Sequence, residues 1–182
     1  MFRKLIIIIF LVFLFTGCER VDLESAEAAY DAGDYETAFK EYLYLAEKGN
    51  ALSQHNLGVM YQDGSGVSQD DAEALKWYRK AAEQGNELAI NNLACIFATS
   101  PDETLRDGSE AIRLAKAYLK VHNDEVSVLD TLAAAYAEAG RFEDAIETQK
   151  KVLSMTKEDS PHLAEIQSHL NSYQDNKPWR EY

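Results

Sequence analysis

The sequence predicts an all-α protein, an α-solenoid of antiparallel helix pairs that ends in a C-terminal capping helix. The first reason is self-similarity: AEKGNAL at residues 46–52 returns as AEQGNEL at 82–88, 36 residues later. In addition, AYDAGDYETAF at 29–39 returns as AYAEAGRFEDAI at 135–146, an offset of 107 residues. Apolar residues also recur at helical spacing on both sides of glycine-bearing turns. Such a period is typical of stacked helix pairs.

The N-terminus has the pattern of a secretory signal. Two basic residues precede an apolar run at residues 5–15, and Thr16-Gly17-Cys18 follows it. The run is shorter than the ~20 residues that a transmembrane helix needs, although an uncleaved anchor is the alternative. We therefore expect residues 1–17 to be a signal peptide.

Residues 15–18, Phe-Thr-Gly-Cys, resemble a bacterial lipobox, with phenylalanine where leucine is usual. The resemblance implies that Cys18 becomes a lipidated mature N-terminus, and more than one acyl chain gives stable membrane anchoring. Residues 18–22 would then be a short lipidated linker. Glu19 follows the cysteine, whereas an aspartate would resemble an inner-membrane retention signal, so we expect a periplasm-facing lipoprotein of the outer rather than the inner membrane.

The charge balance argues against one class of partner. The chain has 18 basic and 31 acidic residues, and removal of residues 1–17 takes away two basic ones, which leaves a net charge of −15. Phosphate backbones are bound by clustered lysine and arginine, so we expect no nucleic-acid partner. No cofactor is expected either, because no cofactor-binding motif occurs in the sequence.

Four helix pairs are predicted, at about 23–50, 51–86, 87–122 and 123–158. The Gly-Asn dipeptides at 49–50 and 85–86 would end one helix and cap the next. A capping helix is expected at 159–176, with Ser160 as its N-cap and Pro161 as its first residue. Residues 177–182 would form a tail, either folded back through Trp179 or free to bind a partner.

The glycine-rich stretch YQDGSGVSQDD at 61–71 is interpreted as a hinge between two helices. As a calcium loop starting at Asp63 it would place serine and alanine at the positions of the turn glycine and the bidentate glutamate. It also has no Gly-Lys-Ser/Thr ending and no preceding strand, as a phosphate loop requires. Asp70 and Glu73 instead have the spacing of a capping box.

Two segments resemble known repeat families. The pattern at residues 57–85 resembles a Sel-like repeat, through Leu57-Gly58, Tyr61, Asp63-Gly64, Gly66-Val67, Ala74, Trp77-Tyr78, Ala81-Ala82 and Gly85. Residues 130–146 resemble a tetratricopeptide repeat (TPR), through Leu132, Ala133, Tyr136, Gly140, Phe142 and Ala145. The resemblance implies that the following residues pack the helices together: Leu57, Gly58, Tyr61, Ala74, Tyr78, Ala81, Ala133, Tyr136 and Ala145.

The resemblance also implies a concave partner-binding groove lined by the first helix of each pair. The transferred positions are Glu24, Asp31, His55, Asn56, Gln62, Asn91, Asn92, Cys95, Asp130, Thr131 and Glu138. Because none of them is lysine or arginine, a polar or basic segment is the expected ligand, and Asp130 and Glu138 are expected to face solvent. Asn56 and Asn92 occupy equivalent places, where asparagine could instead bond to neighbouring backbone.

No catalytic or metal-binding pattern is found. The four histidines are scattered, and no nucleophile elbow, Ser-x-x-Lys, HExxH or CxxC motif occurs. We therefore expect a non-catalytic, lipid-anchored scaffold that binds other envelope proteins. A lipoprotein that contacts peptidoglycan is the alternative, and a Sel-like β-lactamase is a third reading, although Cys95 lacks the paired cysteines of those relatives.

Overall fold

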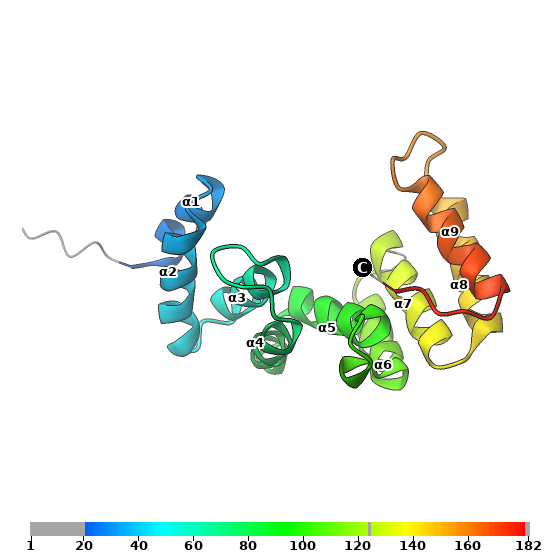
Figure 1. Ribbon diagram of the computed structural model, residues 1–182, viewed down its shortest axis with the longest axis horizontal. Coiled ribbons are helices and arrows are strands. Elements are labelled where there is room, and N and C mark those ends of the chain that lie inside the picture. The colour runs from blue at the N-terminus through cyan, green and yellow to red at the C-terminus, as the bar shows by residue number, and fades with distance from the viewer. Residues whose placement is uncertain (1–20, 124, 181–182) are drawn as a thin grey trace, which may run out of the picture.

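The computed structural model describes residues 21–123 and 125–180, and its helix pairs follow one another along the longest axis of the molecule (Figure 1). All regular structure in these ranges is helical, so the predicted fold class is confirmed. The predicted signal peptide at 1–17 and Cys18 lie outside the described residues. Within the described ranges, no helix is both long and apolar enough to cross a bilayer.

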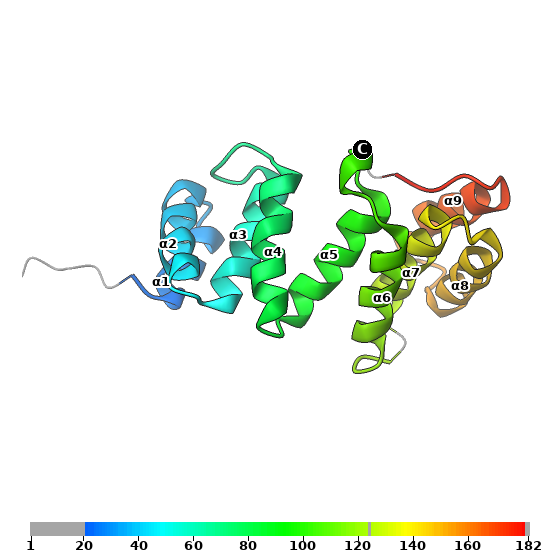
Figure 2. The ribbon, with the colours of Figure 1, turned by 90° about the horizontal axis from the view of Figure 1, so that it is seen from below.

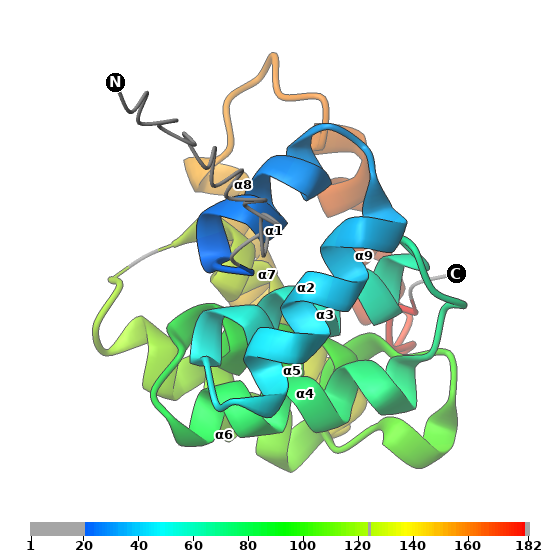
Figure 3. The same cartoon turned by 90° about the vertical axis from the view of Figure 1, so that its left-hand side faces the viewer.

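In residues 21–123 and 125–180 the helices form four antiparallel pairs and a final helix, α9. Figure 2 shows the alternating directions within the pairs, and Figure 3 shows, end-on, that successive pairs are rotated relative to one another. The pairs are α1 (Leu23–Asp31) with α2 (Tyr35–Glu47), α3 (Ala51–Asp63) with α4 (Asp71–Glu83), α5 (Glu87–Thr99) with α6 (Gly108–Leu119), and α7 (Val126–Glu138) with α8 (Phe142–Met155). A short 3₁₀ helix, Glu103–Leu105, precedes α6, and α9 spans Leu163–Gln174.

Each Gly-Asn dipeptide ends one pair and starts the next. Gly85 has φ +83°, a left-handed conformation that glycine adopts without steric cost. The Oδ1 atom of Asn86 then accepts a hydrogen bond from the backbone N–H of Ala89 at 2.9 Å and caps α5. Asn50 caps α3 in the same way at 2.8 Å.

The hinge between α3 and α4 also contacts the first pair. Gly66 has φ +72°, and a Cβ atom there would lie within contact of the carbonyl oxygen of Tyr35, the first residue of α2. Only glycine therefore fits. Among the described residues, no group of acidic, histidine or cysteine side chains could hold a metal ion.

Half of the predicted capping box forms. The carboxylate of Asp70 accepts from the backbone N–H of Glu73 at 3.0 Å. The predicted bond from the N–H of Asp70 to the Glu73 carboxylate does not form. That N–H donates to the carbonyl of Tyr61, and the Glu73 carboxylate pairs with Lys76. The hinge is thus closed by the end of α3 rather than by Glu73.

The paired helices α3 and α4 approach each other closely where Gly58 leaves room for the ring of Tyr78. A Cβ at Gly58 would lie 2.5 Å from Cε1 of Tyr78, whose side chain is fully buried in the main core. Of the nine predicted packing residues, Tyr61 is half-buried and packs edge-on against Phe39, and the other eight are buried. The core therefore runs between helices rather than through one centre.

The predicted start of α9 is wrong by two residues. Leu163, not Pro161, is the first helical residue, and the side chain of His162 makes no capping bond. Ser160 instead accepts from the N–H of His162 through Oγ and from the N–H of Leu163 through its carbonyl. Residues 160–162 form a turn because these bonds complete it before the helix begins.

Candidate functional site

The predicted groove positions fall into two groups on the first helices of the pairs. One group lies between α3 and α5 and forms a hydrogen-bond network. The other lies beside a cavity bounded by α5, α7 and α9. Glu24 and Asp31 stand apart from both, exposed on α1.

His55 is a buried link between two repeats rather than an open groove residue. Its side chain is covered beside the Tyr78 ring, with ring centroids 5.7 Å apart. The Nδ1–H donates to Oδ1 of Asn56 at 3.1 Å, and Nε2 accepts from Nδ2 of Asn92 at 3.3 Å. Burial lowers the pKa of His55 below its usual value, because the charged form would lose hydration, and the bond to Asn56 opposes this shift.

The other amides of this group also serve the fold. Gln62 accepts a hydrogen bond from the Tyr78 hydroxyl at 2.9 Å, and burial raises the pKa of that hydroxyl. Asn91 is half-buried, and its Oδ1 has no hydrogen-bond partner within the described part of the chain. Asn56 and Asn92 were suggested to bond to neighbouring backbone. This is wrong for Asn92, which bonds to the His55 side chain of the preceding repeat.

Cys95, Asp130 and Thr131 of the second group line a cavity of about 750 Å³ on the concave side. Asp130 lies in its wall, where its Oδ1 accepts from Gln149 at 2.6 Å and from Nδ1 of His169 at 3.2 Å. Thr131 also lies in the wall, and its hydroxyl donates to the carbonyl of Ser127 at 3.2 Å. Lining residues come from four parts of the chain: Cys95, Thr99, Val126, Ser127, Asp130, Thr131, Ala134, residues 155–157, residues 159–162, Glu165, Ile166, His169 and Trp179.

Cys95 lies at the α5 side of this cavity and is half-buried. Its Sγ atom is 3.7 Å from Oγ1 of Thr99, whose hydroxyl donates to the Cys95 carbonyl at 2.9 Å. The thiol is therefore part of a helical side-chain contact at the end of α5.

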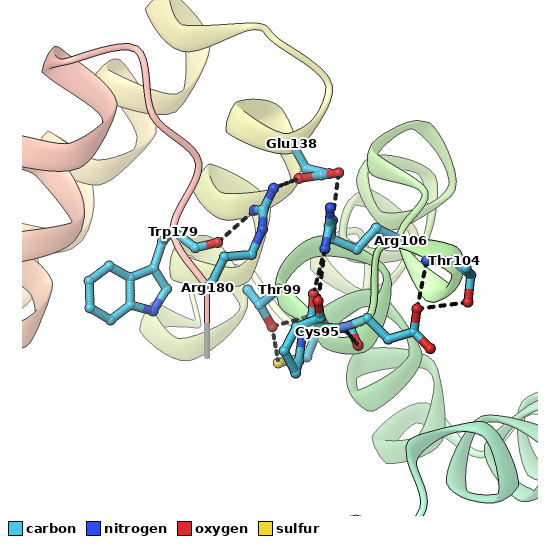
Figure 4. Close-up of polar contacts among 10 residues, drawn as sticks. Cys95, Thr99, Thr104, Arg106, Glu138, Trp179 and Arg180 are labelled. Atoms are coloured by element: carbon cyan, nitrogen blue, oxygen red, sulfur yellow. Dashed lines mark hydrogen bonds and ion pairs between the residues drawn. The ribbon is translucent and has the colours of Figure 1, made fainter. Parts of the chain in front are cut away.

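Glu138 does not face solvent as expected, because two arginines enclose its carboxylate (Figure 4). Nε of Arg106 lies 3.0 Å from Oε1, and Nη2 of Arg180 lies 2.5 Å from Oε2. The Glu138 side chain is only 15% exposed. Asp130 is likewise partly covered, with 27% of its side chain exposed, so the expectation of two free carboxylates is wrong.

Sequence reasoning missed the partners of these carboxylates. Arg106 lies in the loop before α6, His169 on α9, and Arg180 beyond α9. The sequence around His169 and Arg180 contains no local pattern that would identify their carboxylate partners many residues away. The expectation that Trp179 folds back does agree with its place in the cavity wall.

Residues 51–86 and 88–117 match the model of the Sel1 repeat family. The match covers less than half of the chain and shows that these two segments are similar to Sel1 repeats. Over 48 residues, 26% of this chain, it is 52% identical to an exopolysaccharide production negative regulator of Rhizobium leguminosarum bv. viciae, of which the match spans 18%.

Two solved structures share the fold of the repeat array. One is c5321, a protective antigen of uropathogenic Escherichia coli that displays an SLR fold, with a TM-score of 0.59, 23% identity, and coverage of 88% of this chain and 34% of the antigen. The other is a Sel1 repeat protein from Oxalobacter formigenes, with a TM-score of 0.55, 24% identity, and coverage of 91% and 71%. These Sel1 and SLR neighbours support the helical-repeat architecture beyond the two matched segments.

Proposed function

We propose that this Sel1-repeat chain is a non-catalytic scaffold that binds segments of other envelope proteins on its concave face. The observation that carries the proposal is the 750 Å³ cavity, which the first helices of two successive pairs, α5 and α7, enclose together with α9. Pockets of about 300–1,000 Å³ bury ligands of small-molecule size, so this cavity has room for side chains of a bound segment. The site depends on the stacking of repeats, as expected of an interaction array.

The lining indicates what kind of segment fits. Val126, Ile166 and Met155 supply apolar surface. The charged lining residues are three carboxylates and one lysine: Asp130, Asp159, Glu165 and Lys157. A segment that presents an apolar or aromatic side chain beside a basic one would match both features. This favours a polar or basic partner.

A cavity-filling variant tests the proposal. Thr131→Trp should block the cavity, and Glu147→Trp places the same side chain on the exposed surface of α8 as a matched control. Proteins captured from solubilised envelopes should be lost with the first variant and kept with the control. Capture that is equal for both variants, or retention on purified cell wall instead of protein, would contradict the scaffold.

We also propose that Cys18 anchors the chain in the outer membrane, facing the periplasm. The support is the short apolar run followed by Gly17-Cys18. Cys18→Ser should abolish incorporation of labelled fatty acid and remove the protein from the detergent fraction, or leave it unprocessed. A wild-type protein that takes up no label would refute the anchor.

A further inference from the structure

Residues 175–180 form a strap that turns back from α9 across the concave side toward α7 and α5 (Figures 1 and 2). The turn is a Schellman motif: the N–H of Asn176 donates to Tyr173, and the N–H of Lys177 donates to Ser172 at 2.9 Å. Asn176 has the required positive φ of 57°. Pro178 then favours extended backbone, so the sequence itself directs the strap back over the repeats.

The strap is held by two adjacent side chains. The Trp179 ring lies 4.4 Å from the His169 ring, between centroids, and forms part of the cavity wall. Arg180 extends farther and pairs with Glu138, and its side chain is only 20% exposed. In contrast, Lys177 at the start of the strap is exposed and pairs weakly, at 3.5 Å, with Asp175. Recognition is therefore concentrated in an aromatic residue followed by arginine.

Contacts within the helical repeats hold Glu138 in position to pair with Arg180. Arg106 binds one carboxylate oxygen and also donates to the carbonyl of Ser100 at 3.0 Å, which fixes its position. The second oxygen points to the strap, as Figure 4 shows. Arg106 already balances the charge of Glu138, and Arg180 gives the second oxygen of this largely covered carboxylate a charged donor.

We propose that the strap is an internal occupant of the groove, and that the partner presents the same aromatic–arginine pair to His169 and Glu138. The strap then competes with the partner and lowers its apparent affinity. This inference rests on the proposed binding function. Because the strap is tethered beside its site, its effective concentration is on the order of millimolar, which is enough to exclude weak ligands.

A peptide supplied in trans tests this competition. The probe is the fluorescent, amidated hexapeptide of residues 175–180, Asp-Asn-Lys-Pro-Trp-Arg. Its binding is measured by anisotropy with the wild type, with the open variant Trp179→Ala/Arg180→Ala, and with the control Lys177→Ala. The open variant should bind the peptide about tenfold or more tightly than the wild type, and the control should match the wild type.

Changes in the peptide separate specific recognition from general charge attraction without any risk to folding. Arg180→Ala and Lys177→Ala each remove one positive charge from it, but only Arg180 contacts Glu138. The first change should weaken binding to the open variant about tenfold or more, and the second should change it by less than about twofold. Circular dichroism of the open variant checks that the helices are intact.

Three results would overturn the inference. If the wild type and the open variant bind the peptide equally, the strap is not a competitor. If the open variant binds no peptide, or binds both altered peptides equally, the groove does not recognise the aromatic–arginine pair. The scaffold proposal would survive any of these results, because the Thr131→Trp comparison tests it without the peptide.

Discussion

Replacement of Gly58 by leucine should destabilise the contact between α3 and α4. A Cβ atom at residue 58 would lie 2.5 Å from Cε1 and 2.6 Å from Cδ1 of Tyr78. That ring cannot move aside freely, because it is fully buried and its hydroxyl is bonded to Gln62 at 2.9 Å. Leucine adds three further carbon atoms to this overlap.

Two effects of opposite sign set the magnitude. Overpacking of a core typically costs about 1–3 kcal/mol, and this short distance favours the upper end. Leucine in place of glycine recovers about 0.8 kcal/mol of helix propensity. The net loss should be about 2 kcal/mol, which corresponds to a fall in melting temperature of about 4–8 °C for a chain of this size.

Thermal and urea unfolding followed by circular dichroism would measure the loss. Ala28→Leu, on the exposed face of α1, controls for a leucine added without overlap. In a double-mutant cycle, Tyr78→Ala should make Gly58→Leu less damaging, because it vacates the space that leucine needs. An unchanged melting temperature, or strictly additive effects, would refute the close approach of the two helices.

Three further outcomes are expected. Gly85→Ala should lower stability by about 1–2 kcal/mol, because alanine is strained in the left-handed conformation. Gly66→Ala should lower it by more, because Gly66 has the same conformation and also lies against the backbone of Tyr35. Equal losses in urea unfolding would contradict this. The lowered pKa of His55 implies stability that is fully present above pH ~6.5 and decreases as the pH falls through that value and then through the lower folded-state pKa, so His55→Gln should flatten this acid limb. Asn86→Ala should cost about 1 kcal/mol by removing the cap of α5, visible as a lower urea midpoint.

The fold could be predicted because its signals are local and repeated. Gly85-Asn86 is both a helix end and a helix start in the sequence, and the same bonds appear in the structure. Gly58 likewise marks a close approach that any large side chain would prevent. Such features depend on a few neighbouring residues, so a period in the sequence is enough to place them.

The site could be predicted only in part, because its contacts join distant segments. His55 was placed in the groove by its position on α3, but its burial depends on Tyr78 and on Asn92 from the next repeat. Glu138 appeared to be a free carboxylate, yet Arg106 reaches it from a loop whose sequence departs from the repeat pattern. The path of such a loop is set by tertiary bonds, and periodicity says nothing about them.

The bond between His55 and Asn92 has a consequence for how this array could lengthen. Asn56 occupies in its own repeat the place that Asn92 has in the next, and Ala82 likewise corresponds to Ala46, whose carbonyl accepts from Gln54 at 3.0 Å. After a tandem duplication of residues 51–86, His55 of the first copy would therefore lie beside Asn56 of the second copy. Gln54 of the second copy would likewise lie beside the carbonyl of Ala82 in the first copy. We expect such a duplicate to gain helical content in proportion to its added residues, so that gene duplication could extend the concave face without new compensating mutations.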